Sequence, residues 1–453
     1  MDERTPSWGI TPVPERLRVL GLVDLTLLWG NLSISLLVIV AAAGLVPMLS
    51  FQDALLAILI GALAGNLLLG LAAAIGADAR VPGMVVLRAP LGQRGSYLPT
   101  VVNVAQNLGW STFELIIIST AAAALSERVF GFSARWLWAL LFGAVSLALG
   151  LLGPIGFVRR YVRKFAVWAV AASIAYLTWW ALDKANLHEL WNTRGTGGLS
   201  LGQGIDLVMA SVISWTPLAA DYTRFARNRR GAFWGAGVGY FFPTLWCFAL
   251  GAVLVLARDL SDPAQIPSAV ASGSVIAVVA LLMLTVDESD EAFADVYSTA
   301  VSLQNLLPRA PQRLLIAVVA AVATAGAIAI SLGNYLTFLF LLGSVFVPLF
   351  GVLLADWLAR GAHYSERDIF AGPAVRWAPI AAWIVGFVLY QWLSPVGPNW
   401  WTGVVDHLSP GHARLTASLP SFMAAFGVTL LAAWIDSTRA ATRRSREPLP
   451  RQG

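Results

Sequence analysis

The chain has 453 residues, of which 58% are hydrophobic and only 12% are charged. A soluble protein of this length carries about twice that charged fraction, so the composition excludes an ordinary soluble globular protein. The net charge of +5 is not a nucleic-acid signal, because the arginines fall between apolar runs, and the single Cys247 leaves no disulfide or cysteine metal site. Repeated apolar runs of about 18 residues or more predict an all-α polytopic membrane protein.

The apolar runs predict twelve membrane spans. In chain order they lie at about 22–46, 53–76, 99–126, 134–153, 164–183, 203–224, 233–257, 272–305, 313–331, 333–357, 376–394 and 415–435. Residues 1–21 and 436–453 then form terminal segments, and 376–435 forms two peripheral helices. The first ten spans, residues 22–357, form the core.

Loop charges predict the orientation of the spans. Basic residues gather after even-numbered spans and in the tail, for example Arg80, Arg88, Arg94, Arg159, Arg160, Arg163, Lys164, Arg224, Arg227, Arg309 and Arg443. The opposite loops are balanced or acidic. Both termini are therefore expected in the cytoplasm, and the chain in the cell's inner (plasma) membrane.

Two predicted spans are interrupted by residues that disturb a helix. Span 1 contains Gly30 and Asn31 in mid-run, and span 6 contains Pro217 just after Trp215. Such residues free backbone groups that polar neighbours must satisfy. Breaks in spans 1 and 6 favour two inverted repeats, residues 22–183 and 203–357, around a midplane substrate site. The alternative is a proline kink and a packing face of small residues.

Span 8 carries an unusual group of acids. Five carboxylates occur between positions 287 and 295, and on a helix they share one arc of about 160°: Asp287, Glu288, Asp290, Glu291 and Asp295. A carboxylate at membrane depth is costly without a partner or an aqueous cavity. The acids therefore predict a cation-attracting site on one helix, 272–305. The alternative is that the bilayer ends near Thr285 and the acids are a solvated helix end.

Span 3 has a polar and aromatic face. Asn103, Asn107, Trp110 and Glu114 recur at about one turn, with Gln106 beside them. A tryptophan ring followed by a carboxylate one turn later suits the stacking and hydrogen bonding of a flat polar heterocycle. In the alternative interpretation Trp110 is core packing and Glu114 pairs with an arginine.

These motifs resemble those of the nucleobase–cation symporter-1 family, the purine–cytosine and hydantoin permeases, over roughly residues 15–360. The resemblance rests on WGNLSIS in span 1, RAPLGQRGSYLP before span 3, GWSTFE in span 3, SWTPLAADYTRF in span 6 and VYSTAVSLQN in span 8. It implies a LeuT-like core of five plus five helices in inverted repeat, with discontinuous helices 1 and 6, working by alternating access.

The resemblance also implies two groups of site residues. The substrate group would be Trp110, Glu114, Ser214, Trp215, Asp295 and Ser35. The coupling-ion group would be the carbonyls of Asn31, Ile34 and Val286 with the side chains of Ser289 and Asp290. This chain departs from the family pattern by carrying acids at Glu114, Asp290 and Asp295. Coupling to protons is therefore favoured, and the alternative is a sodium ion at the coupling-ion site.

The expected function is cation-coupled import of a nucleobase such as cytosine or a purine, or of a related nitrogen heterocycle. The alternative substrate is a cationic or amine-bearing heterocycle such as a thiamine precursor, for example a hydroxymethylpyrimidine. An enzyme is not favoured, because the sequence has no HExxH motif and its four histidines lie in predicted loops, so no metal-dependent site is visible. Paired broken helices argue against a channel. No cofactor, nucleic acid or obligate protein partner is expected beyond the substrate, the coupling ion and the lipid bilayer.

Overall fold

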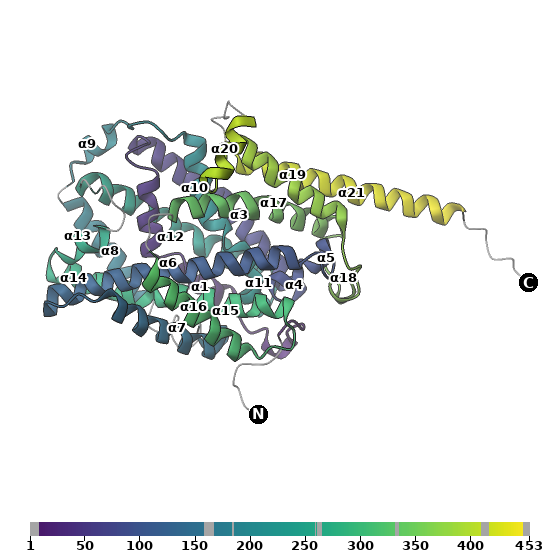
Figure 1. Ribbon diagram of the computed structural model, residues 1–453, viewed down its shortest axis with the longest axis horizontal. Coiled ribbons are helices and arrows are strands. Elements are labelled where there is room, and N and C mark those ends of the chain that lie inside the picture. Colours follow the sequence, from purple (N-terminus) through teal and green to yellow (C-terminus); the bar gives the residue numbers. More distant parts are fainter. Residues whose placement is uncertain are drawn as a thin grey trace, which may run out of the picture.

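The computed structural model is all-α in the part of the chain that it describes, residues 9–157, 167–183, 185–258, 260, 265–330, 335–408 and 416–446 (Figure 1). The helices are α1 (Leu22–Asn31), α2 (Leu36–Ala41), α3 (Phe51–Ala79), α4 (Gly83–Val86), α5 (Arg88–Leu91), α6 (Tyr97–Phe130), α7 (Arg135–Phe157), α8 (Val167–Asp183), α9 (Leu187–Asn192), α10 (Leu201–Ile213), α11 (Thr216–Thr223), α12 (Arg229–Arg258), α13 (Gln265–Ala271), α14 (Val275–Asp287), α15 (Ser289–Leu306), α16 (Gln312–Ala329), α17 (Tyr335–Ala359), α18 (Glu366–Phe370), α19 (Trp377–Leu393), α20 (Asn399–Leu408) and α21 (Ser418–Arg446). Several begin at a side-chain cap, as at Ser50, Ser200 and Ser274. The predicted basic residues Arg159, Arg160, Arg163 and Lys164 lie outside the described residues.

The predicted breaks in spans 1 and 6 are confirmed. Helices α1 and α2 meet at an angle of 55° across residues 32–35, and α10 and α11 are separated at Ser214 and Trp215. Pro217 lies in the first turn of α11, where its missing N–H costs no helix hydrogen bond. The two breaks therefore arise from residues that the sequence makes visible.

Span 8 differs from the single helix predicted over 272–305. It begins at Val275 and is divided at Glu288, where α14 ends and α15 begins. Every residue from 287 to 305 except Leu303 is buried, so α15 is surrounded by protein on all sides. The interpretation of the acids as a solvated helix end is wrong for this reason.

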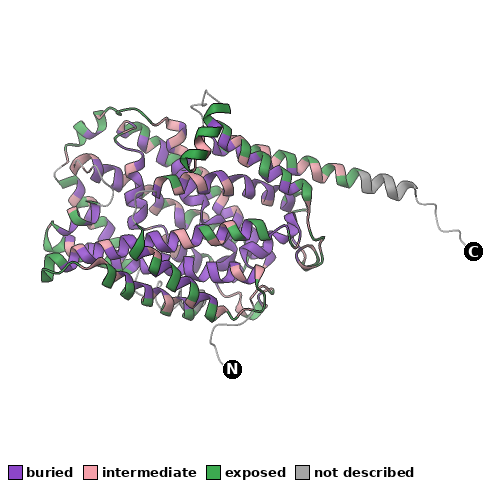
Figure 2. Ribbon diagram, viewed as in Figure 1, coloured by how far each residue is buried: buried purple, intermediate pink, exposed green. Residues whose placement is uncertain are grey.

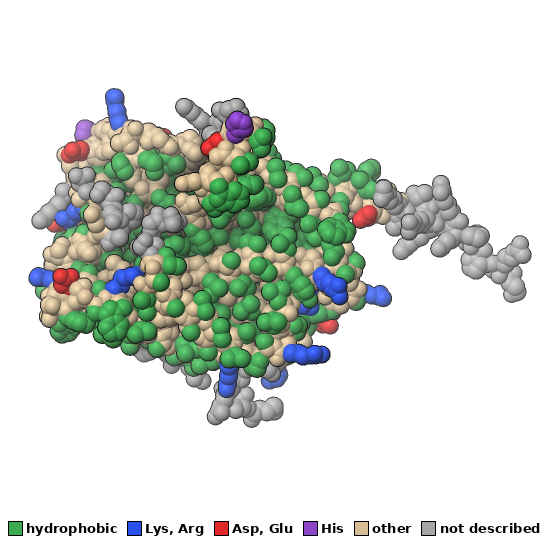
Figure 3. All heavy atoms as spheres, in the orientation of Figure 1, with side chains coloured by type: hydrophobic (Ala, Val, Ile, Leu, Met, Phe, Trp, Pro, Cys, Tyr) green, Lys and Arg blue, Asp and Glu red, His purple; other side chains and the backbone are tan. Residues whose placement is uncertain are grey.

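Among the described residues, seven helices are long and apolar enough to cross a membrane, or eight if α1 and α2 form one span. The other four predicted spans correspond to α8 and α19, which have 17 residues each, and to the divided pairs α10/α11 and α14/α15. Figure 3 shows a largely apolar face, with charged side chains mainly toward its ends and lower edge. This surface is typical of a protein embedded in lipid.

The core of the molecule forms where broken and continuous helices meet. Helix α6 packs against α15, and α12 packs against both α1 and α3. In Figure 2 α6 and α15 are buried along most of their length, whereas α7, α12 and α21 are exposed on one side. Helix α21 packs on α17 and α19 and then projects from the body (Figure 1). The buried polar residues of α6 and α15 therefore lie deep in the molecule.

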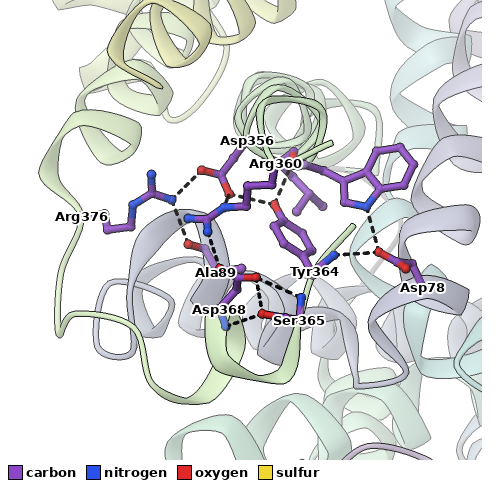
Figure 4. Close-up of polar contacts among 10 residues, drawn as sticks. Asp78, Ala89, Asp356, Arg360, Tyr364, Ser365, Asp368 and Arg376 are labelled. Carbon is purple, nitrogen blue, oxygen red and sulfur yellow. Dashed lines mark hydrogen bonds and ion pairs between the residues drawn. The ribbon is translucent and has the colours of Figure 1, made fainter. Parts of the chain in front are cut away.

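A polar network fixes the helix ends at one side of the bundle (Figure 4). Asp356 of α17 accepts from Arg360 Nε at 2.9 Å, from Arg376 at 2.5 Å and from the Tyr364 hydroxyl at 3.0 Å. The backbone N–H of Tyr364 donates to Asp78, at the end of α3, at 2.9 Å. This network joins α3, α17 and α19, because each acid is bound by residues of other segments.

The same network also lowers the pKa of an acid in α18, Asp368. Burial alone would raise the pKa of Asp368, but hydrogen bonds from Ser365 and the positive charge of Arg360 outweigh it and lower that pKa.

Arg88 was expected to be a loop charge that sets the topology, but it is buried. Its Nε donates to Asn305 Oδ1 at 2.7 Å, so this arginine connects α5 to the end of α15.

Candidate functional site

The break in span 6 is held by the polar face of α6. Gln106 Nε2 donates to the backbone carbonyl of Ser214 at 2.9 Å and to Asn103 Oδ1 at 3.0 Å. Asn103 Nδ2 in turn donates to Ser302 Oγ of α15 at 2.9 Å. A carbonyl freed by the break therefore finds a side-chain donor, as an interrupted buried helix requires.

The break in span 1 is held by an acid from span 8. The Glu288 carboxylate accepts the Ser35 hydroxyl at 2.6 Å and the Leu36 N–H at 3.0 Å. Ser35 Oγ also accepts the Leu37 N–H at 3.0 Å, as the N-cap of α2. A negative charge at a helix N-terminus is favourable, because the free N–H groups and the helix dipole both point toward it. Glu288 therefore fastens α2 to the junction of α14 and α15.

Asn31, the last residue of α1, contacts two further acids. Its Nδ2 donates to Asp290 Oδ2 at 2.6 Å and lies 3.2 Å from both carboxylate oxygens of Asp287. Its Oδ1 is buried with no hydrogen-bond partner among the described residues, and so is Ser289 Oγ. The two ends of the broken span are thus bound to three neighbouring acids of span 8.

Three buried carboxylates converge beside this junction. One oxygen each of Glu114, Glu288 and Glu291 lies within 4.8 Å of the other two, and none of these residues is more than 4% exposed. Two ionised carboxylates at that separation repel each other by roughly 3 kcal/mol at an effective dielectric constant of about 20. Among the described residues no lysine, arginine or histidine forms an ion pair with Glu114, so its expected alternative pairing with arginine is not found there. The trio can attract a positively charged group.

The two predicted stacking tryptophans belong to different aromatic groups. The Trp215 ring lies 5.9 Å from Trp29 and 6.0 Å from Tyr240. The Trp110 ring lies 5.9 Å from Tyr335 and is 9% exposed. Apolar spans gave no signal that Trp29, Tyr240 and Tyr335 would surround the site. All five of these rings are buried, each at most 9% exposed.

The remaining predicted residues are less closely joined. Asp295 is buried one turn after Glu291, and the Ser214 hydroxyl donates within its own helix, to Ser211 O at 2.7 Å. The Ile34 N–H donates to Asn31 O at 3.1 Å. Val286 is 43% exposed, in contrast to the buried acids that follow it.

A helical bundle whose first and sixth spans break around buried polar groups has the LeuT-like fold of secondary transporters. Residues 12–428 match the family model of permeases for cytosine/purines, uracil, thiamine and allantoin. The chain therefore belongs to this family, the nucleobase–cation symporter-1 family, and is a membrane transporter rather than an enzyme. The match extends beyond the region in which the sequence motifs were found.

Two curated relatives are similar to the chain in sequence, and two solved structures are similar to it in fold. It is 26% identical over 397 residues to the cytosine permease of Escherichia coli K12, covering 85% of this chain and 89% of that protein. It is 23% identical over 408 residues to the hydantoin permease of Microbacterium maritypicum, covering 83% and 82%. The fold is similar to that of Mhp1, a nucleobase-cation-symport-1 family transporter, in a closed conformation with bromovinylhydantoin bound (TM-score 0.76, 19% identity, 96% of both chains). It is also similar to a Na⁺-coupled sialic acid symporter (TM-score 0.64, 10% identity, 96% and 92%).

Proposed function

We propose that the protein is a symporter that uses a cation gradient to import a nucleobase such as cytosine or a purine, or a related nitrogen heterocycle, by alternating access. The observation that carries the proposal is the junction of Asn31 with Asp287 and Asp290. Buried carboxylates at a helix break offer a place for a cation, and a cation bound there would change how span 1 is held against span 8.

In this proposal the coupling site comprises Asn31, Ile34, Val286, Ser289 and Asp290. A buried carboxylate can take up either a proton or a sodium ion. Protons are the favoured coupling ion here, and sodium is the alternative. The Asn31 Oδ1 and Ser289 Oγ atoms, which have no partner among the described residues, support a further ligand at this place. The protein would need no other cofactor and would work in the plasma membrane with both termini in the cytoplasm.

The proposed substrate group comprises Trp110, Trp215, Glu114, Asp295, Ser35 and Ser214. The flat ring of the base would lie between the two indoles, and Glu114 and Asp295 would accept from its edges. An ionised carboxylate only accepts hydrogen bonds, so the preferred base carries several N–H donors. Cytosine and adenine meet this requirement better than uracil.

The test is uptake of radiolabelled cytosine into proteoliposomes with an imposed gradient. The proposal predicts accumulation above the external concentration, which a channel cannot produce. Unlabelled adenine should compete more strongly than uracil. Stronger competition by uracil than by cytosine itself would contradict the roles of Glu114 and Asp295. Simple equilibration of cytosine, under any cation gradient, would contradict symport.

A further inference from the structure

Helices α6 and α15 run antiparallel with a fixed register. Asn103 of α6 is hydrogen-bonded to Ser302 of α15 at 2.9 Å. Eleven residues further along α6 is Glu114, and eleven residues back along α15 is Glu291, and these two residues meet in the carboxylate trio. The same faces of the two helices therefore stay opposite each other over the intervening turns.

The interface between α6 and α15 contains a row of buried polar atoms with no partner among the described residues. On α6 they are both side-chain atoms of Asn107, Trp110 Nε1, Ser111 Oγ and Glu114 Oε2, and on α15 the row ends at Glu291 Oε1. At 100° per residue the four α6 residues fall on one arc of about 100°. Each unsatisfied buried polar group costs about 1–3 kcal/mol, so such a concentration indicates a place for a polar ligand.

The unsatisfied atoms define which ligand fits. Glu114 and Glu291 can only accept hydrogen bonds when ionised, whereas Trp110 Nε1 can only donate. A bare metal ion would satisfy the carboxylates and leave the indole N–H without an acceptor. A single organic molecule with a cationic N–H end and an acceptor end satisfies both. From Trp110 to Glu114 the helix rises by about 6 Å, the length of a substituted six-membered ring.

The carboxylate trio suits one such cationic group. A primary ammonium with N–H···O distances of about 2.8 Å separates its acceptors by about 4.6 Å, because its three donors are arranged tetrahedrally. Here one oxygen of each carboxylate lies no more than 4.8 Å from the other two, so that a single ammonium nitrogen can reach all three. Glu288 is already fixed by the N-terminus of α2, so it offers a rigid third acceptor.

We infer that Glu114, Glu288 and Glu291 form the subsite for a positively charged amino group on the transported heterocycle, with Trp110 and Asn107 binding its ring end. This inference rests on the proposed function and narrows it, since the substrate class becomes amine-bearing, cationic nitrogen heterocycles. The coupling cation is assigned to other residues, Asn31 and Asp290. The trio therefore decides which heterocycle is selected.

The test compares two probes of the same shape. They are 4-amino-2-methylpyrimidines that carry either a 5-aminomethyl group, which is cationic, or a 5-hydroxymethyl group, which is neutral. Dissociation constants are measured by calorimetry on the full-length protein in nanodiscs. The cationic probe should bind about tenfold more tightly or better, as expected for a charge-assisted hydrogen-bond set. Glu114→Gln and Glu291→Gln should each bring the ratio of the two constants close to one.

Glu127→Gln is the matched control, because Glu127 is an exposed carboxylate in the same helix. It should keep the wild-type ratio. Equal binding of the two probes by the wild type, binding of neither probe, or an unchanged ratio in both buried variants would overturn the inference. Gradient-driven cytosine accumulation by the same preparation separates the two claims. If cytosine accumulates while the probes are not distinguished, only the amino-group subsite is wrong; if no heterocycle accumulates, the proposed function fails as well.

Discussion

Trp110 and Trp215 are single residues on which the substrate assignment depends. Each packs edge-to-face against a neighbouring ring, with Tyr335 beside Trp110 and Trp29 beside Trp215. We predict that Trp110→Ala and Trp215→Ala lose detectable binding of the base, because each removes the buried contact area of an indole as well as its stacking, which contributes on the order of 1 kcal/mol beyond burial. Ligand-induced thermal shifts of the purified variants provide the measurement.

Truncating a buried indole also costs about 3–5 kcal/mol of stability. Trp110→Phe and Trp215→Phe are therefore included, since phenylalanine keeps a ring for stacking and should retain weakened binding. Normal transport by either alanine variant would show that the tryptophan concerned is core packing only.

Glu288 has a structural task that its position among the five acids did not reveal. It accepts from Ser35 and Leu36 at the start of α2. We predict that Glu288→Ala lowers stability by about 1–3 kcal/mol, because the hydrogen bonds to Ser35 and Leu36 and the negative charge at the start of α2 are lost. Glu288→Gln should lose less, since its amide oxygen still accepts.

Thermal unfolding of the detergent-purified variants measures this effect, with Glu127→Ala as an exposed control expected to change stability by no more than about 0.5 kcal/mol. A Glu288→Ala variant as stable as the wild type would mean that the contact with α2 contributes nothing.

At the scale of helices, Gln106 supports the break between α10 and α11. Gln106→Leu would leave the buried carbonyl of Ser214 without its side-chain donor. We expect a loss of about 1–2 kcal/mol, even though the substitution also removes one unpartnered oxygen. Gln52→Leu is the matched control, because exposed Gln52 also donates to a backbone carbonyl, that of Trp191. Equal thermal stability of the two variants would contradict the supporting role of Gln106.

The sequence predicted helices and their interruptions better than it predicted contacts. Gly30, Asn31 and Pro217 mark the two breaks because their effects on a helix are local. The division of span 8 at Glu288 was not predicted, since it accompanies a bond to Ser35, which is 253 residues away in the chain. Helical periodicity shows which residues share a face of one helix, but it does not show which residues of distant helices they contact. The same limit explains why Arg88 was taken for a loop charge rather than a partner of Asn305.

At the scale of the molecule, composition and apolar runs were sufficient to predict an all-α membrane protein. The interrupted spans and the resemblance of the motifs predicted a transporter, which the family match confirms. Which residues of span 8 meet which residues of spans 1 and 3 depends on the packing of α6, α14 and α15, and required the structure. The division into repeats at 22–183 and 203–357 stays a prediction. So do the roles of the substrate and coupling-ion residues, which are tested by transport.

The most direct measurement is cytosine uptake into proteoliposomes under an imposed proton gradient, compared with an imposed sodium gradient. We predict that an inward proton gradient drives accumulation and that Asp290→Asn abolishes it, whereas Asp183→Asn, which changes an exposed acid, does not. Accumulation driven by sodium but not by protons would make the proton assignment wrong. Full gradient-driven accumulation by Asp290→Asn would remove Asp290 from the coupling site, and failure of both gradients to concentrate cytosine would contradict cation-coupled transport of this base.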